Sequence, residues 1–161
     1  MQFNVSSLLR EHLGADRSYD LERVPPIHRG TAKLTRTPDG VLVQVRAELI
    51  IDSVCSRCLA PFGYETEISF DETYHQQVDV VSARRLAEPE DPETFLIDTH
   101  HIIDITEAVR QYSETATEMQ PLCRPECPGI CPVCGKDLNM APCSCDREPK
   151  DSRWAALAAL N

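Results

Sequence analysis

Residues 41–52 read VLVQVRAELIID, a run in which apolar and polar side chains alternate. Every odd-numbered position in this run is apolar: Val41, Val43, Val45, Ala47, Leu49 and Ile51. Most of the even-numbered positions between them are polar. A period of two that continues through the whole run predicts a β-strand with one buried face.

Two further strands are predicted beside this one. The segment GTAKLTRT at 30–37 precedes it and is joined to it by the turn PDG at 38–40. The sequence CSRC at 55–58 follows it, and residues 62–75 then alternate between an apolar and an acidic face. Short connections between consecutive strands predict an antiparallel meander with CSRC in its second turn.

The segments that flank the meander carry weaker patterns. Residues 3–13, FNVSSLLREHL, are compatible with either the start of a strand or a short helix. VPPIHRG at 24–30 predicts a linker or turn, because proline has no amide donor. Residues 78–99 contain two prolines and six acidic residues and predict an exposed loop.

A helix is predicted from IDITEAVRQYSETATEM at 103–119. Asp104 or Thr106 is a suitable cap, and Pro121 is expected to end the helix. One helical face carries the apolar side chains Ile105, Ala108, Val109, Tyr112, Ala116 and Met119. We expect this face to pack against the sheet.

The fold class predicted from these patterns is α+β: an antiparallel β-meander with a packed helix and a C-terminal cysteine-rich zinc-binding segment. Two domains are expected. Residues 1–120 would form an acidic α+β body, and residues 121–161 a cysteine-rich zinc segment. DSRWAALAAL at 151–160 predicts a short C-terminal helix in that segment.

Composition and charge narrow the class of protein. No apolar run reaches the roughly 18 residues of a membrane span, and the N-terminal apolar cluster is too short for a signal peptide. A cytoplasmic location is therefore expected. The net charge of −10 resides in residues 1–120, with 11 Lys/Arg against 21 Asp/Glu, whereas residues 121–161 hold 5 of each. An acidic surface repels phosphate and argues against a large nucleic-acid footprint.

Eight cysteines in a reducing compartment favour metal binding over disulfides. The segment CPVCGKDLNMAPCSC at 131–145 supplies four thiols, and a C-x-x-C turn can present two sulfurs to one ion. A loop of eight residues can return a second pair to the same metal. The first predicted zinc site is therefore Cys131, Cys134, Cys143 and Cys145.

The four remaining cysteines predict a second zinc site if the helix folds back over the sheet: Cys55, Cys58, Cys123 and Cys127. Other partitions stay open at this point, in which Cys123 or Cys127 joins the 131–145 cluster and CSRC is free. CSRC is also compatible with a redox dithiol, although a thioredoxin-like dithiol begins a helix after a parallel strand.

Recognised catalytic patterns are missing from the sequence. It holds no HExxH helix, no G-x-S-x-G elbow and no phosphate-binding glycine loop. A zinc ion held by four thiolates has no open position for water, which makes such a site structural. We therefore expect no enzyme activity and no small-molecule substrate.

The chain resembles the YceD-like family of bacterial large ribosomal RNA subunit accumulation proteins. The resemblance extends from about residue 28 to 160 and rests on CSRCL, IDITEAVRQ, PLCRPECPGICPVCGKDLNMAPCSC and DSRWAALAAL. The family's usual Asp-Pro-Arg in the tail is Asp-Ser-Arg here. The resemblance implies a role in accumulation of large-subunit ribosomal RNA, and no catalytic residues carry over from it.

The leading hypothesis is a non-enzymatic zinc factor in large-subunit biogenesis, whose partner is a ribosomal protein, a large-subunit rRNA precursor, or both. An acidic body suits a basic ribosomal protein. The neutral end offers five basic residues for local contact with RNA or a partner: Arg124, Lys136, Arg147, Lys150 and Arg153. The alternatives are a redox-responsive zinc/thiol switch and an enzyme with an open Cys–His metal site.

Overall fold

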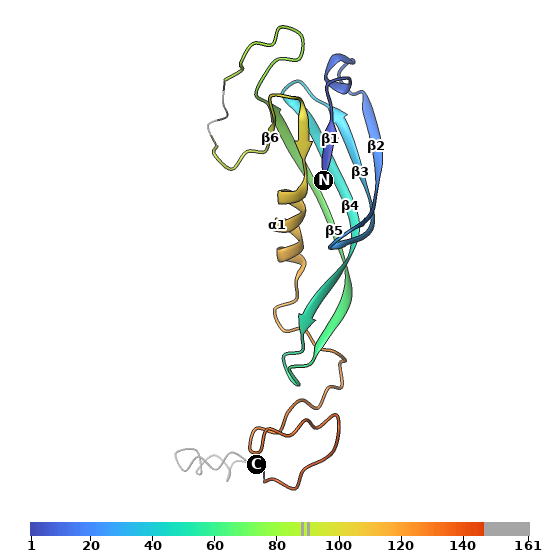
Figure 1. Cartoon of the computed structure of the whole chain (residues 1–161), viewed down its shortest axis with the longest axis vertical. Coiled ribbons are helices and arrows are strands. Elements are labelled where there is room, and N and C mark those ends of the chain that lie inside the picture. Colours follow the sequence, from blue (N-terminus) through green and yellow to red (C-terminus); the bar gives the residue numbers. More distant parts are fainter. Residues whose placement is uncertain (88, 90, 147–161) are drawn as a thin grey trace, which may run out of the picture. The chain divides into compact units, whose positions relative to one another are not determined.

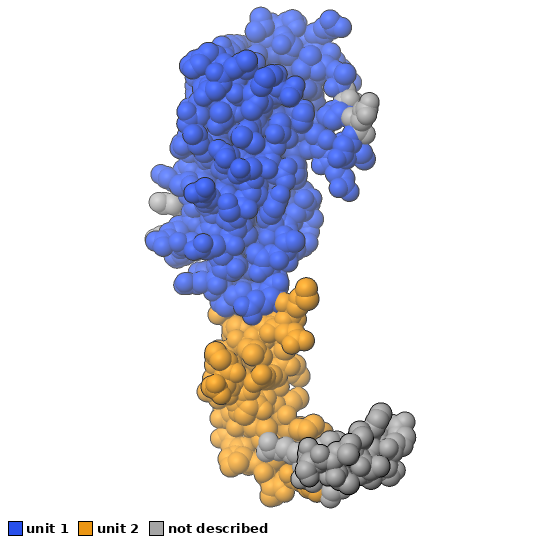
Figure 2. Space-filling model, turned by 180° about the vertical axis from the view of Figure 1, so that it is seen from behind, with its two compact units in different colours: residues 1–51, 64–118 blue, residues 52–63, 119–161 orange. Residues whose placement is uncertain are grey.

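The structure is a computed structural model of the chain, and it describes residues 1–87, 89 and 91–146. These residues form two compact units (Figure 2). Unit 1 comprises residues 1–51 and 64–118, and unit 2 comprises residues 52–63 together with the chain from 119 onward. The tip of a β-hairpin thus belongs with the cysteine-rich segment, although 66 residues of sequence separate Cys55 from Pro121.

A five-stranded sheet dominates unit 1 (Figure 1). Its order is β2-β3-β4-β5-β6, with bounds Asp16–Val24, Ile27–Arg36, Gly40–Val54, Pro61–Gln76 and Leu96–Ile97. β3 pairs antiparallel with both β2 and β4, whereas β6 pairs parallel with the end of β5. The predicted meander is present as β3-β4-β5, and the sheet extends beyond it on both sides.

The alternation in residues 41–52 produces the expected one-sided strand. In β4, Val41, Val43 and Val45 are fully buried, whereas Gln44 and Arg46 on the other face are not. Ala47 and Leu49 continue the buried row. Fully burying a side chain of this size contributes about 1.5–3 kcal/mol, so this strand supplies a large part of the core.

Several short elements were not predicted. β2 was missed, and the turn expected around Pro25 and Pro26 is the tight connection from β2 to β3. Residues 3–13 contain both elements that the sequence left open, the strand β1 (Gln2–Asn4) and a 3-10 helix (Leu8–Arg10). β1 pairs antiparallel with β7 (Ile102–Asp104) in a separate two-stranded sheet. The loop at 78–99 holds β6 near its end.

The helix α1 (Thr106–Ala116) packs against the sheet as expected. Tyr112 stacks on Phe70 of β5, with ring centroids 4.4 Å apart, and its hydroxyl donates to a Glu72 carboxylate oxygen at 2.6 Å. Asp104 accepts the Thr106 amide at 2.9 Å at the start of the helix. Among the described residues α1 is the one α-helix, so the fold is mostly β.

The helix ends earlier than predicted. Met119 was expected on its apolar face but lies beyond it and is fully exposed. Thr117 is extended, and the Glu118 amide donates to the Tyr64 hydroxyl at 3.0 Å instead of to a carbonyl of the helix. The predicted helix at 151–160 lies outside the described residues. No described helix has the length and apolar character needed to cross a membrane.

Candidate metal centres

The turn between β4 and β5 positions the first two cysteines of unit 2. The Cys55 amide donates to the Ala60 carbonyl at 3.0 Å, and the Leu59 amide donates to the Cys55 carbonyl at 2.9 Å. Leu59 has φ of 60°, a left-handed conformation that tightens the turn. The reversal brings Cys55 and Cys58 to the same side of the chain, as a C-x-x-C turn requires for two sulfurs to reach one ion.

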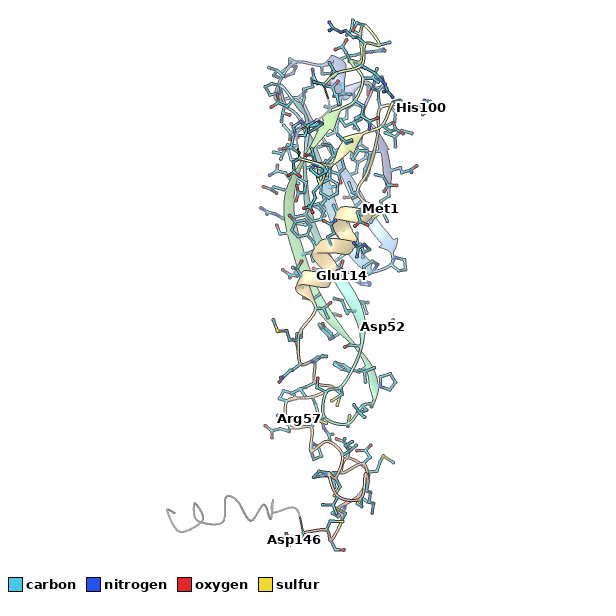
Figure 3. The ribbon with its side chains drawn as sticks, turned by 90° about the vertical axis from the view of Figure 1, so that its left-hand side faces the viewer. Met1, Asp52, Arg57, His100, Glu114 and Asp146 are labelled. Carbon is cyan, nitrogen blue, oxygen red and sulfur yellow. The ribbon has the colours of Figure 1, made fainter. Side chains whose placement is uncertain are left out.

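Two cysteines from residues 119–130 complete this group, which we call the hairpin cluster: Cys55, Cys58, Cys123 and Cys127. The Ser56 amide donates to the Pro121 carbonyl at 2.8 Å, and a guanidinium nitrogen of Arg57 donates to the Cys127 carbonyl at 3.0 Å. Arg57, labelled in Figure 3, therefore fixes the returning chain against the turn. Its role was not predicted, because nothing in CSRC distinguishes this arginine from a solvated one.

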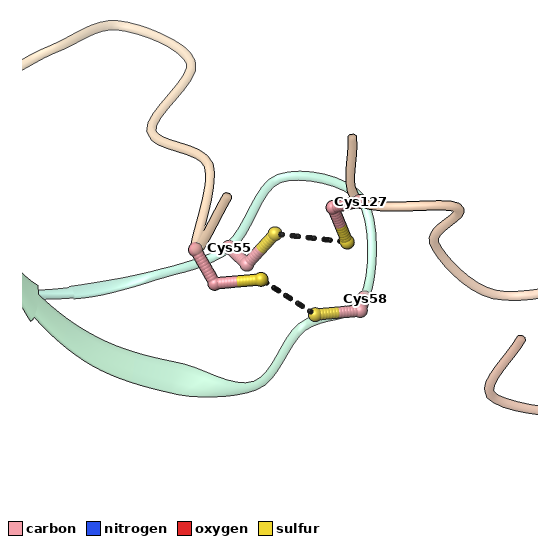
Figure 4. Close-up of side chains that lie close together, drawn as sticks. Cys55, Cys58 and Cys127 are labelled. Atoms are coloured by element: carbon pink, nitrogen blue, oxygen red, sulfur yellow. Dashed lines mark hydrogen bonds between the residues drawn. The ribbon is translucent and has the colours of Figure 1, made fainter. Parts of the chain in front are cut away.

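The sulfur atoms of the hairpin cluster have the spacing of a tetrahedral site. The sulfurs of Cys55 and Cys127 are 3.8 Å apart, as are those of Cys58 and Cys123 (Figure 4). All four lie within 4.8 Å of one another. Zinc–sulfur bonds of about 2.3 Å at tetrahedral angles place the sulfurs about 3.8 Å apart, whereas a disulfide bond is about 2.05 Å long.

The ionisation of the hairpin cluster is uneven. Backbone amides of Cys123 and Cys58 donate to the Cys55 sulfur and lower the pKa of this thiol to about 6. Burial and the hydrogen bond with Cys127 raise the pKa of Cys123 to about 12. Four sulfurs this close resist becoming thiolates together, and a divalent cation is the partner that would stabilise all four charges.

The second group, which we call the knuckle cluster, is formed by Cys131, Cys134, Cys143 and Cys145. A tight turn holds its first pair: the Gly135 amide donates to the Cys131 carbonyl, and the Cys131 amide to the Lys136 carbonyl, both at 2.8 Å. Gly135 has φ of +70°, where glycine carries no steric penalty. These four sulfurs also lie within 4.8 Å of one another.

Each cluster has one exposed cysteine, but the hairpin cluster buries two of its cysteines and the knuckle cluster only one. Cys131 is buried, but Cys134 is exposed and the other two cysteines are half-buried. Amides of Cys134 and Val133 lower the pKa of the Cys131 thiol to about 6. The hydrogen bond with Cys134 raises the pKa of Cys145 to about 12. The same donor set, with the same uneven ionisation, suits a soft divalent ion here too.

The structure therefore groups all eight cysteines into the same two sets that the sequence predicts. The other partitions, in which CSRC was free, do not occur in it. All eight thiols are free of disulfide bonds. The clusters could each hold a metal ion.

Two of the five predicted contact residues lie in the part of the chain that the structure describes. Arg124 is exposed, and its guanidinium donates to the Oδ1 atom of Asn139. Lys136 is exposed, and its ammonium donates to the Pro142 carbonyl at 3.2 Å. Arg147, Lys150 and Arg153 lie outside the described residues. Arg124 thus has a structural partner inside unit 2 that the sequence did not predict.

Comparison with known proteins matches residues 43–161 to the family described as large ribosomal RNA subunit accumulation protein YceD. An uncharacterized protein of Mycobacterium bovis is 30% identical over 122 residues, which is 76% of this chain and 56% of the relative. Uncharacterized proteins of two Mycobacterium tuberculosis strains match equally well. The chain thus spans just over half the length of these relatives. No solved structure matches it.

Proposed function

Because the chain belongs to the YceD family of large ribosomal RNA subunit accumulation proteins, we propose that it is a non-enzymatic, zinc-binding factor of large-subunit biogenesis. Membership of this family implies a role in accumulation of the large ribosomal subunit. The family match carries the proposal. The two cysteine clusters suggest how the chain presents a rigid surface for that role. We propose that the protein acts in the cytoplasm.

Zinc is the ion that we propose for both clusters. Four thiolates at tetrahedral spacing are the common ligand set of structural zinc, and soft sulfur ligands select against magnesium and calcium. The sulfur pairs at 3.8 Å in the hairpin cluster support this assignment. When bound, zinc supplies two positive charges that hold the four thiolates together. The chain's own residues, chiefly the amides of the two turns, orient those sulfurs.

A four-thiolate site also supports a non-catalytic role. Zinc enzymes keep a coordination position for water or substrate, which a full set of four protein ligands removes. In each cluster the four cysteines provide a complete set without a histidine or carboxylate. We therefore propose that the metals stabilise a binding surface and take no part in a reaction.

We propose that unit 1 binds a basic ribosomal protein through its acidic surface. Residues 1–51 and 64–118 hold 10 Lys/Arg against 20 Asp/Glu, a net charge of −10, whereas unit 2 holds 6 of each. Along β5, Glu65, Glu67 and Asp71 are exposed on the face opposite the core. A row of acidic side chains attracts cationic partners and raises the rate of encounter. Unit 2 would then make local contact with an rRNA precursor through Arg124, Lys136 and the basic residues that follow.

Depletion of the protein from cells, followed by ribosome sedimentation, tests the proposed function. We expect fewer large subunits and an accumulation of large-subunit rRNA precursors. Unchanged profiles would remove the proposal. Complementation with Glu65→Lys and Glu67→Lys tests the acidic face, because reversed charges should weaken binding of a basic protein. Glu93→Lys, a charge reversal at an exposed residue of the loop before β6, is the control, and we expect it to complement.

A redox-responsive switch is the second candidate, and the knuckle cluster favours it. Cys134 is exposed, and Cys131 has a pKa lowered to about 6, so a metal-free pair would hold a reactive thiolate. Hydrogen peroxide would take two electrons from two thiolates, forming one disulfide and two hydroxide ions and releasing the metal. Metal quantified during peroxide titration distinguishes the candidates. Release only at doses that also damage ordinary zinc proteins would exclude a switch.

A further inference from the structure

One side chain connects the two clusters. Asn139 lies in the loop between Cys134 and Cys143 of the knuckle cluster, yet its Nδ2 atom is 3.7 Å from the Cys127 sulfur of the hairpin cluster. This is a hydrogen-bonding distance for sulfur as the acceptor. Cys127 is almost fully buried, so few other donors can reach its sulfur. This contact links the loop between two cysteines of the knuckle cluster to one cysteine of the hairpin cluster.

The neighbours of Asn139 fix the orientation of its amide. The Arg124 guanidinium, which can only donate, contacts Oδ1. Nδ2 donates one hydrogen to an Asp137 carboxylate oxygen at 2.8 Å. The Asn139 backbone amide donates to the same oxygen and lowers the pKa of Asp137, which keeps this carboxylate an acceptor. The second hydrogen of Nδ2 remains for the sulfur.

The sulfur of Cys127 is also 3.7 Å from Oδ1, which would suit a protonated thiol as donor. A metal-bound sulfur has no proton to donate, so in the loaded cluster the Nδ2 contact is the one that is favourable. An amide donor next to a ligating thiolate disperses its charge and fixes its position. Asn139 is therefore better matched to a loaded hairpin cluster than to a free thiol.

The backbone holds the Asn139 loop in place. Ile130 and Asp137 form an antiparallel bridge, and the Leu138 amide donates to the Gly129 carbonyl at 2.9 Å. Residues 129 and 130 belong to the short linker between Cys127 and Cys131, one ligand of each cluster. Folding the knuckle loop onto this linker delivers Asn139 to Cys127.

We propose that Asn139 is a positioning residue that couples the two clusters, so that metal bound at the knuckle cluster strengthens metal binding at the hairpin cluster. This inference rests on the proposed metal binding. Metal at the knuckle cluster orders the loop that carries Asn139, and the ordered loop stabilises the Cys127 thiolate. By thermodynamic linkage, metal at the hairpin cluster strengthens the knuckle cluster by the same factor.

Cadmium NMR of the full chain tests the coupling, because each tetrathiolate site is expected to give its own signal while a chelator is titrated. We expect Asn139→Ala to keep two bound ions but to lower cadmium affinity at the hairpin cluster about 10-fold, the lower end of outer-sphere effects. Asn139→Asp keeps the shape and the acceptor for Arg124 but loses the N–H donor. It should weaken the hairpin cluster at least as much. Met140→Ala, an exposed neighbour in the same loop, is the control and should change neither signal.

A second comparison separates coupling from a local structural effect. Emptying the knuckle cluster with Cys143→Ser and Cys145→Ser should weaken the hairpin cluster by a similar factor. Adding Asn139→Ala to that variant should then change little, because residues that act through one contact are non-additive. Wild-type affinity at the hairpin cluster in both Asn139 variants, or strictly additive losses, would overturn the coupling alone. A wild-type chain that binds no ion would overturn the zinc proposal and the coupling with it.

Discussion

Two glycines of unit 2 allow a sharp test of how the linker between the clusters is held. Gly129 and Gly135 both have left-handed backbones, with φ of +73° and +70°. A methyl group at Gly135 would have no atom within 4 Å. A methyl group at Gly129 would lie 2.8 Å from the Arg57 carbonyl oxygen and 3.1 Å from the Arg57 Cβ. The two alanine variants therefore share the backbone penalty and differ in the clash.

The magnitudes follow from these contacts. A left-handed alanine costs roughly 1–2 kcal/mol, and Gly135→Ala should show only this loss. In Gly129→Ala the clash involves backbone, so the linker must move away from the hairpin tip. That movement breaks the hydrogen bonds from the Ile130 amide to Arg57, at 3.0 Å, and from the Leu138 amide to Gly129. At about 1 kcal/mol each, these bonds bring the expected loss to roughly 3–4 kcal/mol.

Amide hydrogen exchange on the metal-loaded full chain measures the loss where it occurs, at the amides of Ile130 and Leu138. Exchange reports the free energy of local opening, so the two variants should differ by about 2 kcal/mol at these amides. Equal losses in both variants would refute the reasoning, because they would mean that Gly129 does not lie against Arg57. A larger loss in Gly135→Ala would refute it as well.

Three further predictions concern unit 1 and the metals. Although burial opposes it, hydrogen bonds from Thr106 and Gln2 hold the pKa of Asp104 far below its usual range. Its stabilising effect is therefore fully present above about pH 4 and falls gradually on acidification, so Asp104→Asn should cost about 1 kcal/mol at pH 7 and progressively less below pH 4, as measured by urea denaturation. Leu49→Ala should cost about 2–5 kcal/mol in the same assay, whereas Ile50→Ala, on the exposed face of β4, should cost under 1. A chelator should empty the knuckle cluster, which buries one of its cysteines, before the hairpin cluster, which buries two, and cadmium signals lost in the reverse order would contradict this.

The elements that the sequence predicted correctly are those in which one physical demand determines the residue types. β4 must bury one face, so its side chains alternate over the whole strand. The two groups into which the structure brings the cysteines follow their spacing in the sequence, because a C-x-x-C turn places two sulfurs side by side. Neither inference required knowledge of distant contacts, apart from the assumption that the chain folds back.

The missed elements depend on contacts that leave little trace in local sequence. β2 is an edge strand whose single sheet neighbour is β3, so backbone pairing defines it more than an apolar pattern does. The end of α1 depends on Tyr64, whose hydroxyl accepts a hydrogen bond from the Glu118 amide, 54 residues later in the sequence. Arg57 and Asn139 were missed for the same reason, since a polar residue in a cysteine-rich segment has many possible partners.

The two clusters share their chemistry but constrain the chain very differently. The contact between Cys58 and Cys123 joins residues 65 apart in sequence, whereas the knuckle cluster closes a loop only from 131 to 145. In the chain-entropy treatment of cross-links, closing the longer loop restricts the unfolded chain by about 4 kcal/mol and the shorter one by about 3. The difference in entropy is modest because loop cost rises only with the logarithm of length. The larger distinction is in what each loop contains: β5, β6, β7 and the whole of α1 lie between Cys58 and Cys123, whereas the knuckle loop contains Asn139. Under the proposed metal binding, the hairpin cluster would therefore close the segment that holds β5 and α1, and the knuckle cluster would place one side chain at the other site.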